Sequence, residues 1–172
     1  LEQYPAPEGL TSRPPLLVRI AVGEEELEIY VINNHFTSMS EGELATEPRR
    51  KAQAAWNVTI MEEILKDHPQ AHVAVIGDLN SYYASPPLDI LRRAGLQHVM
   101  STLPDKQRYN YIYQGRSQLL DHILVTPSLM DLLARVDVLH TNADFPLPLP
   151  GDTSPLRTSD HDLVISTFHF PE

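Results

Sequence analysis

The sequence predicts an α/β (α+β) protein, with a mixed β-sheet and flanking helices, and three observations indicate this fold class. Short runs rich in Val, Ile and Leu alternate with segments that have helical periodicity. The length of 172 residues fits one domain of common size. The chain is 42% hydrophobic, which supports a true core and excludes a disordered polypeptide.

The first predicted elements are a β-hairpin and a long helix. Residues 16–22 and 27–35 are rich in Val, Ile and Leu, and residues 23–25 between them (Gly-Glu-Glu) are typical of a turn. Thr46 is expected to cap the helix, which carries Pro48 in its first turn. The helix should pack through one stripe, formed by Ala52, Ala55, Trp56, Thr59, Ile60, Glu63 and Ile64.

The remaining predicted elements are shorter and complete the mixed sheet. Ser85-Pro86 opens a helix that ends near Gly95, and Pro127 begins another short helix. A Pro-rich stretch, FPLPLPGDTSPLRT, precedes the last strand. The expected strands of this part cover residues 72–78, 109–113, 119–125, 135–140 and 163–170.

The composition restricts the kinds of partner that the chain can bind. Its formal net charge of −10 argues against a broad basic face for nucleic acid, because neutralising phosphates requires Lys and Arg. The same charge is compatible with an enzyme whose acidic residues bind a cation. Cysteine is absent, which excludes disulfides and thiolate chemistry. No apolar run reaches the roughly 18 residues that a membrane-spanning helix needs.

Polar side chains follow two of the buried strands at the point where each strand ends. Alternation along the second predicted strand places Asn33 and His35 on one face of the sheet and Asn34 on the other. Asp78 and Asn80 follow the next strand and should point the same way. Taken singly, His35 is more often a hydrogen-bonded strand end, and the Asp78–Asn80 segment a common turn. Open α/β sheets bind ligands at such ends, so the set together predicts a site.

An acidic residue, Asp121, stands inside the apolar strand LLDHILV. A carboxylate there costs several kcal/mol unless it is paired, so an imidazole or a metal ion is the expected partner. His161, in the loop RTSDHDLV, is the obvious imidazole, although such a loop alone is more often a solvated turn. His122 points to the opposite face, where it is structural or lies at a rim. The histidines without polar surroundings in the sequence are expected to be structural: His68, His72, His98, His140 and His169.

Four motifs in this order, NNHF, GDLN, YNYIYQGRSQLLDHILV and SDHD, resemble the endonuclease/exonuclease/phosphatase superfamily, which has the deoxyribonuclease I-like fold. The segments SRPPLLVRI, EPRRKAQA and LHTNADFP are similar to its branch of bacterial, often secreted, nucleases and phosphodiesterases. The resemblance covers the chain from about Ser12, with Leu163 where the family usually has Pro. It implies a metal-dependent, nuclease-like phosphoesterase, and it favours a secreted or cell-envelope location.

The resemblance also implies a role for each polar residue. His161 would be the general base that activates water, and Asp121 would accept a hydrogen bond from its other ring nitrogen. Asp78 would position the nucleophile or the leaving group, and Asn80 would hydrogen-bond a non-bridging phosphate oxygen. His35 would stabilise the charge that develops on the phosphoryl oxygen.

The cofactor that the resemblance implies is a divalent cation, Mg²⁺ or alternatively Mn²⁺ or Ca²⁺, because oxygen ligands suit these ions. Asp160 would hold it together with a Glu that family members carry in an N-terminal half. That Glu, usually in a Gln-Glu pair, and an Asn on the family's first strand have no match in this sequence. The expected contacts with the phosphate-ester substrate, possible nucleic acid included, are Arg13, Tyr109, Tyr111 and Arg157.

Residues 1–172 are therefore expected to form a single C-terminal portion of the family's domain, one half of its four-layer sandwich, with the N-terminal half absent. Segments 27–32 and 71–76 are apolar on both faces, which is typical of a sheet covered on both sides. A second chain or the missing half would cover the free face. Two alternatives stay open: a phospholipid or sugar-phosphate phosphatase of the same fold, and a non-catalytic binding module, against which the complete polar set argues.

Overall fold

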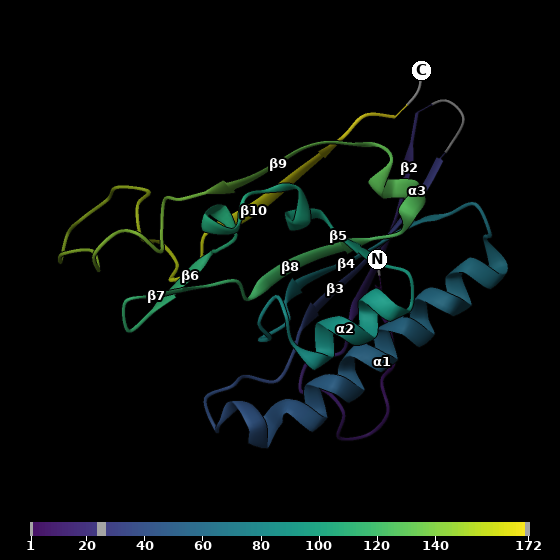
Figure 1. The fold of residues 1–172 in the computed structure, drawn as a ribbon, viewed down its shortest axis with the longest axis horizontal. Coiled ribbons are helices and arrows are strands. Elements are labelled where there is room, and N and C mark those ends of the chain that lie inside the picture. Colours follow the sequence, from purple (N-terminus) through teal and green to yellow (C-terminus); the bar gives the residue numbers. More distant parts are fainter. Residues whose placement is uncertain (1, 24–26, 171–172) are drawn as a thin grey trace.

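A mixed β-sheet forms the centre of the computed structural model, which describes residues 2–23 and 27–170 (Figure 1). Its strands are β1 (Glu2–Gln3), β2 (Leu16–Val22), β3 (Leu27–His35), β4 (His72–Asp78), β5 (Gln97–His98) and β8 (Asp121–Val125). They lie in the order β1-β2-β3-β4-β8-β5. β3 and β4 are parallel and the other neighbours are antiparallel, so the predicted mixed sheet is confirmed.

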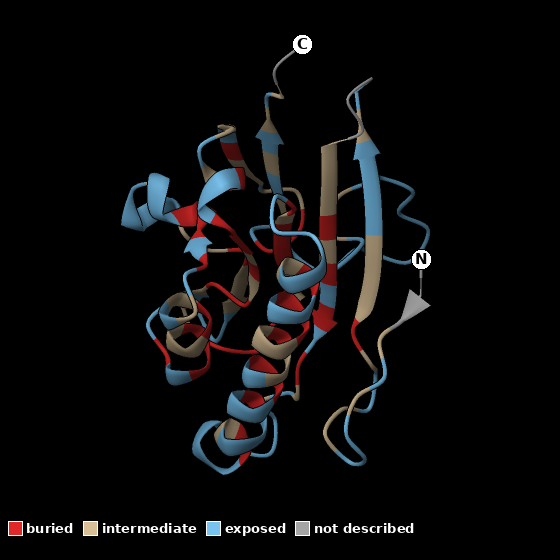
Figure 2. Ribbon diagram, turned by 90° about the vertical axis from the view of Figure 1, so that its right-hand side faces the viewer, coloured by how far each residue is buried: buried red, intermediate tan, exposed pale blue. Residues whose placement is uncertain are grey.

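Helices cover one face of this sheet, and a two-stranded ladder lies against the other (Figures 1 and 2). The helices on this face are α1 (Glu43–Asp67) and α2 (Pro86–Arg93). The short α3 (Pro127–Met130) and a 3₁₀ turn at Val99–Thr102 pack on the second face, and another 3₁₀ turn spans Asp105–Gln107. The ladder on the second face pairs β9 (Leu133–Leu139) with β10 (Leu163–Phe168), and a small hairpin pairs β6 (Tyr111–Tyr113) with β7 (Arg116–Gln118). In the described part of the chain, no helix has the length and apolar character that a membrane span requires.

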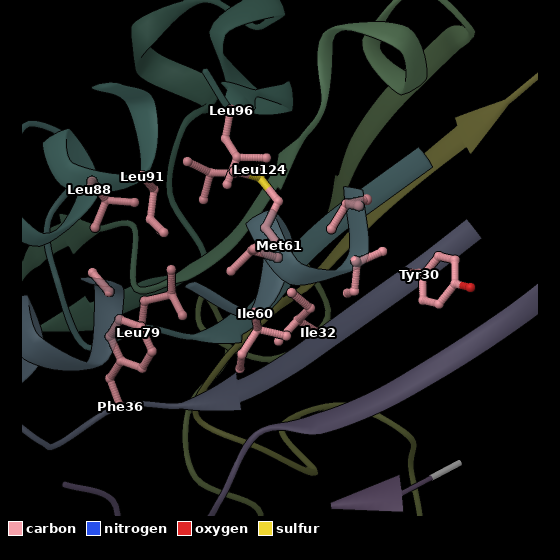
Figure 3. Packing of buried hydrophobic residues seen from close by; sticks show 14 of the residues in the cluster. Tyr30, Ile32, Phe36, Ile60, Met61, Leu79, Leu88, Leu91, Leu96 and Leu124 are labelled. Carbon is pink, nitrogen blue, oxygen red and sulfur yellow. The ribbon is translucent and has the colours of Figure 1, made fainter. Parts of the chain in front are cut away.

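The helix face of the sheet holds the larger apolar core. Ile32 and Leu124 of the sheet pack against Ile60 of α1 and Leu88 of α2 (Figure 3). None of these four side chains is exposed to solvent. Removing each of them from water contributes about 1.5–3 kcal/mol, which makes this interface a major source of stability.

The opposite face of the sheet packs on the β9–β10 ladder. Ala74 and Val125 of the sheet join Val136 of β9 in a second cluster, and Phe168 of β10 lies against it. The strands are therefore apolar on both faces, as predicted, and the ladder covers part of the face expected to be free. On the outer side of the ladder Leu163 is 59% exposed. Cover for the remaining apolar surface, from a second chain or a further segment, stays a prediction.

Helix α1 differs from its prediction in its start and in the face that it buries. It begins at Glu43, so Thr46 is not its cap, and the Thr46 hydroxyl instead donates to the carbonyl oxygen of Gly42 at 2.8 Å. Ala52 and Ala55 of the predicted stripe are exposed. The residues that the helix buries are Thr46, Arg50, Gln53, Ala54, Asn57, Ile60, Met61 and Ile64.

The first half of this buried face is polar, and its side chains form hydrogen bonds with the loops and the strand beneath the helix. Gln53 accepts from the backbone N–H of Thr37 at 2.9 Å and donates to the carbonyl oxygen of Leu10 at 3.1 Å. Asn57 and Asn34 exchange two amide hydrogen bonds of 2.8 and 2.9 Å. Buried polar groups are compatible with a core when they are bonded in this way. Apolar periodicity does not reveal them, so the predicted stripe was wrong for Ala52 and Ala55, whereas its members Ile60 and Ile64 are buried as predicted.

Several predicted boundaries shift by a few residues. Strand β6 begins at Tyr111 rather than at residue 109, and β8 begins at Asp121 rather than at residue 119. The last strand ends at Phe168, two residues earlier than expected. In the predicted turn at residues 23–25, Gly23 has φ 73°, while residues 24 and 25 lie outside the described residues.

Candidate active site

Three neighbouring strands, β3, β4 and β8, bring polar side chains into a row at one end of the main sheet. In the register of the ladders, His35 of β3 lies beside Asp78 of β4, and Asp78 lies beside Asp121 of β8. Cross-strand neighbours point to the same face of a sheet. His161 joins the row through an isolated bridge to Tyr111 of β6. The structure thus brings together residues that are far apart in the sequence, while their catalytic roles remain predictions.

The row borders a cavity of about 460 Å³, whose wall includes His35, Asp78, Asn80 and His161. The two parallel strands approach closely beside it. Gly77 of β4 has φ 115°, and a Cβ atom at this position would collide with the carbonyl oxygen of the adjacent strand β3. A residue without a side chain is therefore required here, and it lets the site form at the carboxyl ends of both strands.

Asp121 and His161 form a hydrogen-bonded pair beside the cavity, and His161 is the member that lines it. Nδ1 of His161 lies 2.5 Å from Oδ2 of Asp121, so the predicted pairing of these two side chains is confirmed. Within the described residues, Nε2 of the imidazole has no hydrogen-bond partner. The bond to Asp121 raises the pKa of His161, while burial acts in the opposite direction. An imidazole held in this way can take up a proton at its free nitrogen.

Asp78 is held by the turn that follows it. Its Oδ1 accepts from the backbone N–H of Asn80 at 2.8 Å, and its Oδ2 accepts from Nδ2 of Asn80 at 3.0 Å. Asn80 has φ 44°, a conformation that Asn adopts more readily than most residues, and Nδ2 also donates to the carbonyl oxygen of Phe36 at 3.1 Å. Burial raises the pKa of Asp78, the bond from Asn80 lowers it, and the neighbouring charge of Asp121 raises it.

His35 is oriented by an arginine on the side away from Asp78. Nη1 of Arg13 lies 2.7 Å from Nδ1 of His35. Because a guanidinium only donates hydrogen bonds, Nδ1 must accept, and the proton of the neutral imidazole is assigned to Nε2. This Nε2 lies 3.6 Å from Oδ2 of Asp78. Arg13, predicted to contact substrate, thus contacts His35 and sets its tautomer.

Two more of the predicted residues border the cavity. The ring of Tyr111 lies 4.6 Å from that of His161, measured between centroids. Asp160, the predicted metal ligand, is exposed and lines the cavity. Tyr82 and Tyr113 also line it, although sequence analysis did not single them out. Their positions depend on how the loops pack, which sequence periodicity does not encode.

The other two predicted substrate contacts, Tyr109 and Arg157, do not line the cavity. The ring of Tyr109 stacks on His140, with 4.4 Å between centroids, and its hydroxyl donates to Asp144 at 3.2 Å. Arg157 donates to the carbonyl oxygen of Asn142 at 2.9 Å. Both polar groups are already bonded to residues around Asn142 and Asp144, so this geometry does not support contacts with substrate.

Sequence analysis missed a polar cluster formed by His140, Asp144 and Asp162. Nδ1 of His140 lies 2.8 Å from Oδ2 of Asp162 and 3.3 Å from Oδ2 of Asp144, so the expectation that His140 lacks polar surroundings was wrong. Burial raises the pKa of Asp162, but bonds from His140 and from the backbone N–H groups of Ala143 and Asn142 outweigh this and lower it. One ligand atom from each member lies within 4.8 Å of the others, a spacing that could hold a metal ion.

His122 is structural, as expected, but it lies in the core rather than at a rim. Its Nε2 donates to the carbonyl oxygen of Ser81 at 2.7 Å, and its Nδ1 lies 2.8 Å from Nε2 of His98. Nδ1 of His98 accepts from the backbone N–H of Met100 at 3.1 Å. This chain of bonds assigns neutral tautomers to both rings. Burial lowers the pKa of His122 to about 4.

A family profile described as endonuclease/exonuclease/phosphatase family matches residues 2–143 of the chain. No curated protein is a significant match to the sequence.

Solved structures have a similar fold. Truncated TDP2 of Caenorhabditis elegans is 19% identical with a TM-score of 0.65, and the match covers 92% of this chain and 61% of that one. The mannosyl-6-phosphatase of Bacteroides thetaiotaomicron is also 19% identical, with a TM-score of 0.63 over 84% of this chain and 52% of that one. A 3′-5′ exonuclease of Neisseria meningitidis is 15% identical, with a TM-score of 0.60 over 93% and 67%. The chain thus spans about half to two thirds of these proteins, and the likeness extends to the fold alone.

Proposed function

Because the chain belongs to the endonuclease/exonuclease/phosphatase family, we propose that it hydrolyses phosphate esters as a metal-dependent phosphodiesterase of the nuclease type. The observation that supports this most is the Asp121–His161 pair beside the cavity, with Nε2 of the imidazole free to bind a water molecule. The pair joins a base to the group that orients it, which is the arrangement that general-base catalysis requires.

In the proposed reaction, the oxygen of water attacks phosphorus while one P–O ester bond breaks. The water proton moves to Nε2 of His161. The leaving alkoxide takes a proton from solvent water to give the alcohol, and the imidazolium then returns its proton to the solvent. Asp121 stabilises the imidazolium that forms, because its carboxylate already accepts a hydrogen bond from Nδ1–H. Positioned bases of this kind typically contribute about 10²–10⁴-fold to a rate.

His35 and Asn80 are proposed to act on either side of the phosphoryl group. The assigned proton on Nε2 of His35 makes this nitrogen a donor for a phosphoryl oxygen, in keeping with its predicted role. Both Nδ2 hydrogens of Asn80 are already donated, to Asp78 and to the carbonyl oxygen of Phe36. Donation from Asn80 to substrate would require one of these bonds to open, so we propose that its first role is to orient Asp78.

The divalent cation that the family implies fits the donor chemistry of the cavity. Asp160 and Asp78 line the cavity with carboxylates, and hard cations such as Mg²⁺ prefer oxygen ligands. These two residues would hold the ion, and it would supply Lewis-acid stabilisation of the phosphoryl charge. Burial raises the pKa of Asp78 and the nearby charge of Asp121 adds to this, and a bound cation would act in the opposite direction. Among the described residues, three His, Asp or Glu ligand atoms meet within 4.8 Å only in the His140 cluster, so the cavity supplies only part of a coordination shell.

The side chains around the cavity favour a substrate that carries a planar base. Tyr82, Tyr111 and Tyr113 all line it, and stacking of a base on an aromatic ring is typically worth about 1–3 kcal/mol. The net charge of −10 disfavours long polyanions, so we propose short or single-stranded nucleic acid rather than a duplex held along its backbone. A phosphatase for sugar phosphates is the second candidate, because the net charge of −10 also suits a substrate that is smaller than a polyanion.

Steady-state hydrolysis by the full natural polypeptide that contains this chain tests the proposal. Three substrates are compared in Mg²⁺: a chromogenic phosphodiester, the matching monoester and a short oligonucleotide. We expect turnover of the diester and the oligonucleotide, loss of turnover in His161→Ala, and normal rates in the control His68→Ala, whose side chain pairs with Glu28 instead. Preference for the monoester would favour the phosphatase, and binding without any turnover would favour the non-catalytic module.

A further inference from the structure

Asn110 is a fully buried amide next to the Asp121–His161 pair, and it takes no part in the steps above. Its Nδ2 donates at 2.8 Å to Oδ2 of Asp121, the same oxygen that accepts from Nδ1 of His161. Its Oδ1 accepts from the backbone N–H of Leu120 at 3.0 Å. Both ends of the amide are therefore engaged, and a flipped amide would face donor with donor and acceptor with acceptor.

The backbone of Asn110 holds the segment that carries the imidazole. Its carbonyl oxygen accepts from the N–H of Asp162, the residue after His161, at 2.7 Å. Asp162 is in turn fixed by two backbone N–H groups, which both donate to its Oδ1 at 2.8 and 2.9 Å. Asn142 donates to the carbonyl oxygen of His161 at 2.8 Å. One residue thus contacts the carboxylate through its side chain and the histidine segment through its main chain.

We propose that Asn110 is a positioning residue, which keeps the carboxylate of Asp121 turned toward His161. The inference rests on the proposed function, because it concerns the same pair. With one donor, a carboxylate can rotate and still keep a bond, whereas two donors on one oxygen fix its orientation. Misplacing a reacting group by about 1 Å can cost on the order of 100-fold in rate, so the effect on turnover should be large.

Asparagine is suited to this position because it combines a donor and an acceptor at a fixed separation. Asn110→Asp keeps the acceptor for Leu120 but brings a second carboxylate next to Asp121. Asn110→Ser adds no charge, but it shortens the side chain and withdraws the donor from Oδ2. Asn57→Ser is the matched control, because Asn57 is also buried but bonds to Asn34 on the helix face of the sheet.

Two measurements test the role in the full natural polypeptide. The first is the low-field proton NMR signal of the Nδ1 proton of His161, assigned by its loss in His161→Gln; this signal needs neither substrate nor turnover. The second is the separate determination of kcat and KM on the chromogenic phosphodiester. For both Asn110 variants we expect the signal to disappear, kcat to fall between about 10- and 100-fold, and KM to stay within about twofold. Asn57→Ser should lower the melting temperature yet keep the signal and kcat.

Two results would overturn the proposal. One is an Asn110→Ser protein that is folded and keeps both the signal and kcat, because the carboxylate would then be oriented without the amide. The other is loss of the signal in Asn57→Ser as well, because general loosening of the fold would then explain the effect. If the unchanged protein hydrolyses no phosphodiester, the proposed function fails, while the NMR comparison still decides the positioning role.

Discussion

Replacing Asp121 by Asn removes one negative charge from the Asp121–His161 pair while keeping its shape. The neighbouring amide decides how the new side chain is oriented. Nδ2 of Asn110 donates to the oxygen of Asp121 that also faces His161. If the new amide placed its own NH₂ group there, two donors would meet, so its oxygen should take this position. The imidazole then keeps its tautomer and loses only the charge that stabilises its protonated form.

The size of this loss follows from the separation of the charges. Two unit charges about 4 Å apart interact by roughly 4 kcal/mol at an effective dielectric constant of about 20, a value suited to sites near the protein surface. Roughly 1.36 kcal/mol corresponds to one decade in rate, so the upper limit is about 10³-fold. His161 is half-buried, and screening by solvent reduces this value. We therefore expect Asp121→Asn to lower kcat by about 10²–10³-fold, against complete loss in His161→Ala.

The assay is the pH dependence of hydrolysis of a chromogenic phosphodiester, with circular dichroism melting as the control for folding. The bond to Asp121 raises the pKa of His161, so activity of the unchanged protein should fall with acidity at a midpoint above the ordinary value of about 6.5. In Asp121→Asn this midpoint should move to lower pH. A folded variant with near-normal kcat and an unmoved midpoint would refute the orienting role of Asp121.

Three further predictions follow from features outside the pair. The isolated 172-residue chain should bind Mg²⁺ weakly, turn over negligibly and associate through apolar surface; a monomer by light scattering with micromolar affinity by calorimetry would contradict this. The pKa of His122 is about 4 in the fold and about 6.5 when unfolded. The free energy of unfolding in urea should therefore be highest above pH 6.5 and fall by on the order of 3 kcal/mol toward pH 4. A free energy of unfolding that does not change with pH would show that the ring is not held neutral. Gly77→Ala should lower the free energy of unfolding in urea by more than the roughly 1–3 kcal/mol of a strained backbone, because the new Cβ meets a carbonyl oxygen. Gly115→Ala, at φ 75° with open space around it, is the control and should lose only the backbone contribution.

The sequence was sufficient to predict the arrangement of the strand ends. Alternation in β3 correctly separated Asn34, which faces α1, from His35, which faces the cavity. A carboxylate in an apolar strand required a partner, and this requirement joined Asp121 to His161 across 40 residues. Both inferences rest on the fixed geometry of a strand and on the cost of a buried charge, which apply whatever the surrounding loops do.

The features that the sequence did not predict depend on contacts between loops. The polar face of α1 was missed because Gln53 and Asn57 are buried by bonds to partners that only the fold brings near. His140 was expected to lack polar surroundings because its partner Asp162 lies 22 residues away in the sequence, just before β10. Tyr109 was placed at the substrate because its ring type suits such contacts, although its hydroxyl is already bonded.

The Asp121–His161 pair joins two layers of the structure, since Asp121 begins β8 of the main sheet and His161 lies two residues before β10 of the second ladder. The proposed proton transfer would therefore depend on docking of the ladder against the sheet, and partial opening of that interface would separate His161 from Asp121 while the helix-side core stayed intact. Sub-global openings of this kind need less free energy than complete unfolding. Heat or denaturant should then abolish turnover before the helices melt, and any partner that presses the ladder onto the sheet would raise the population of competent molecules without touching the substrate.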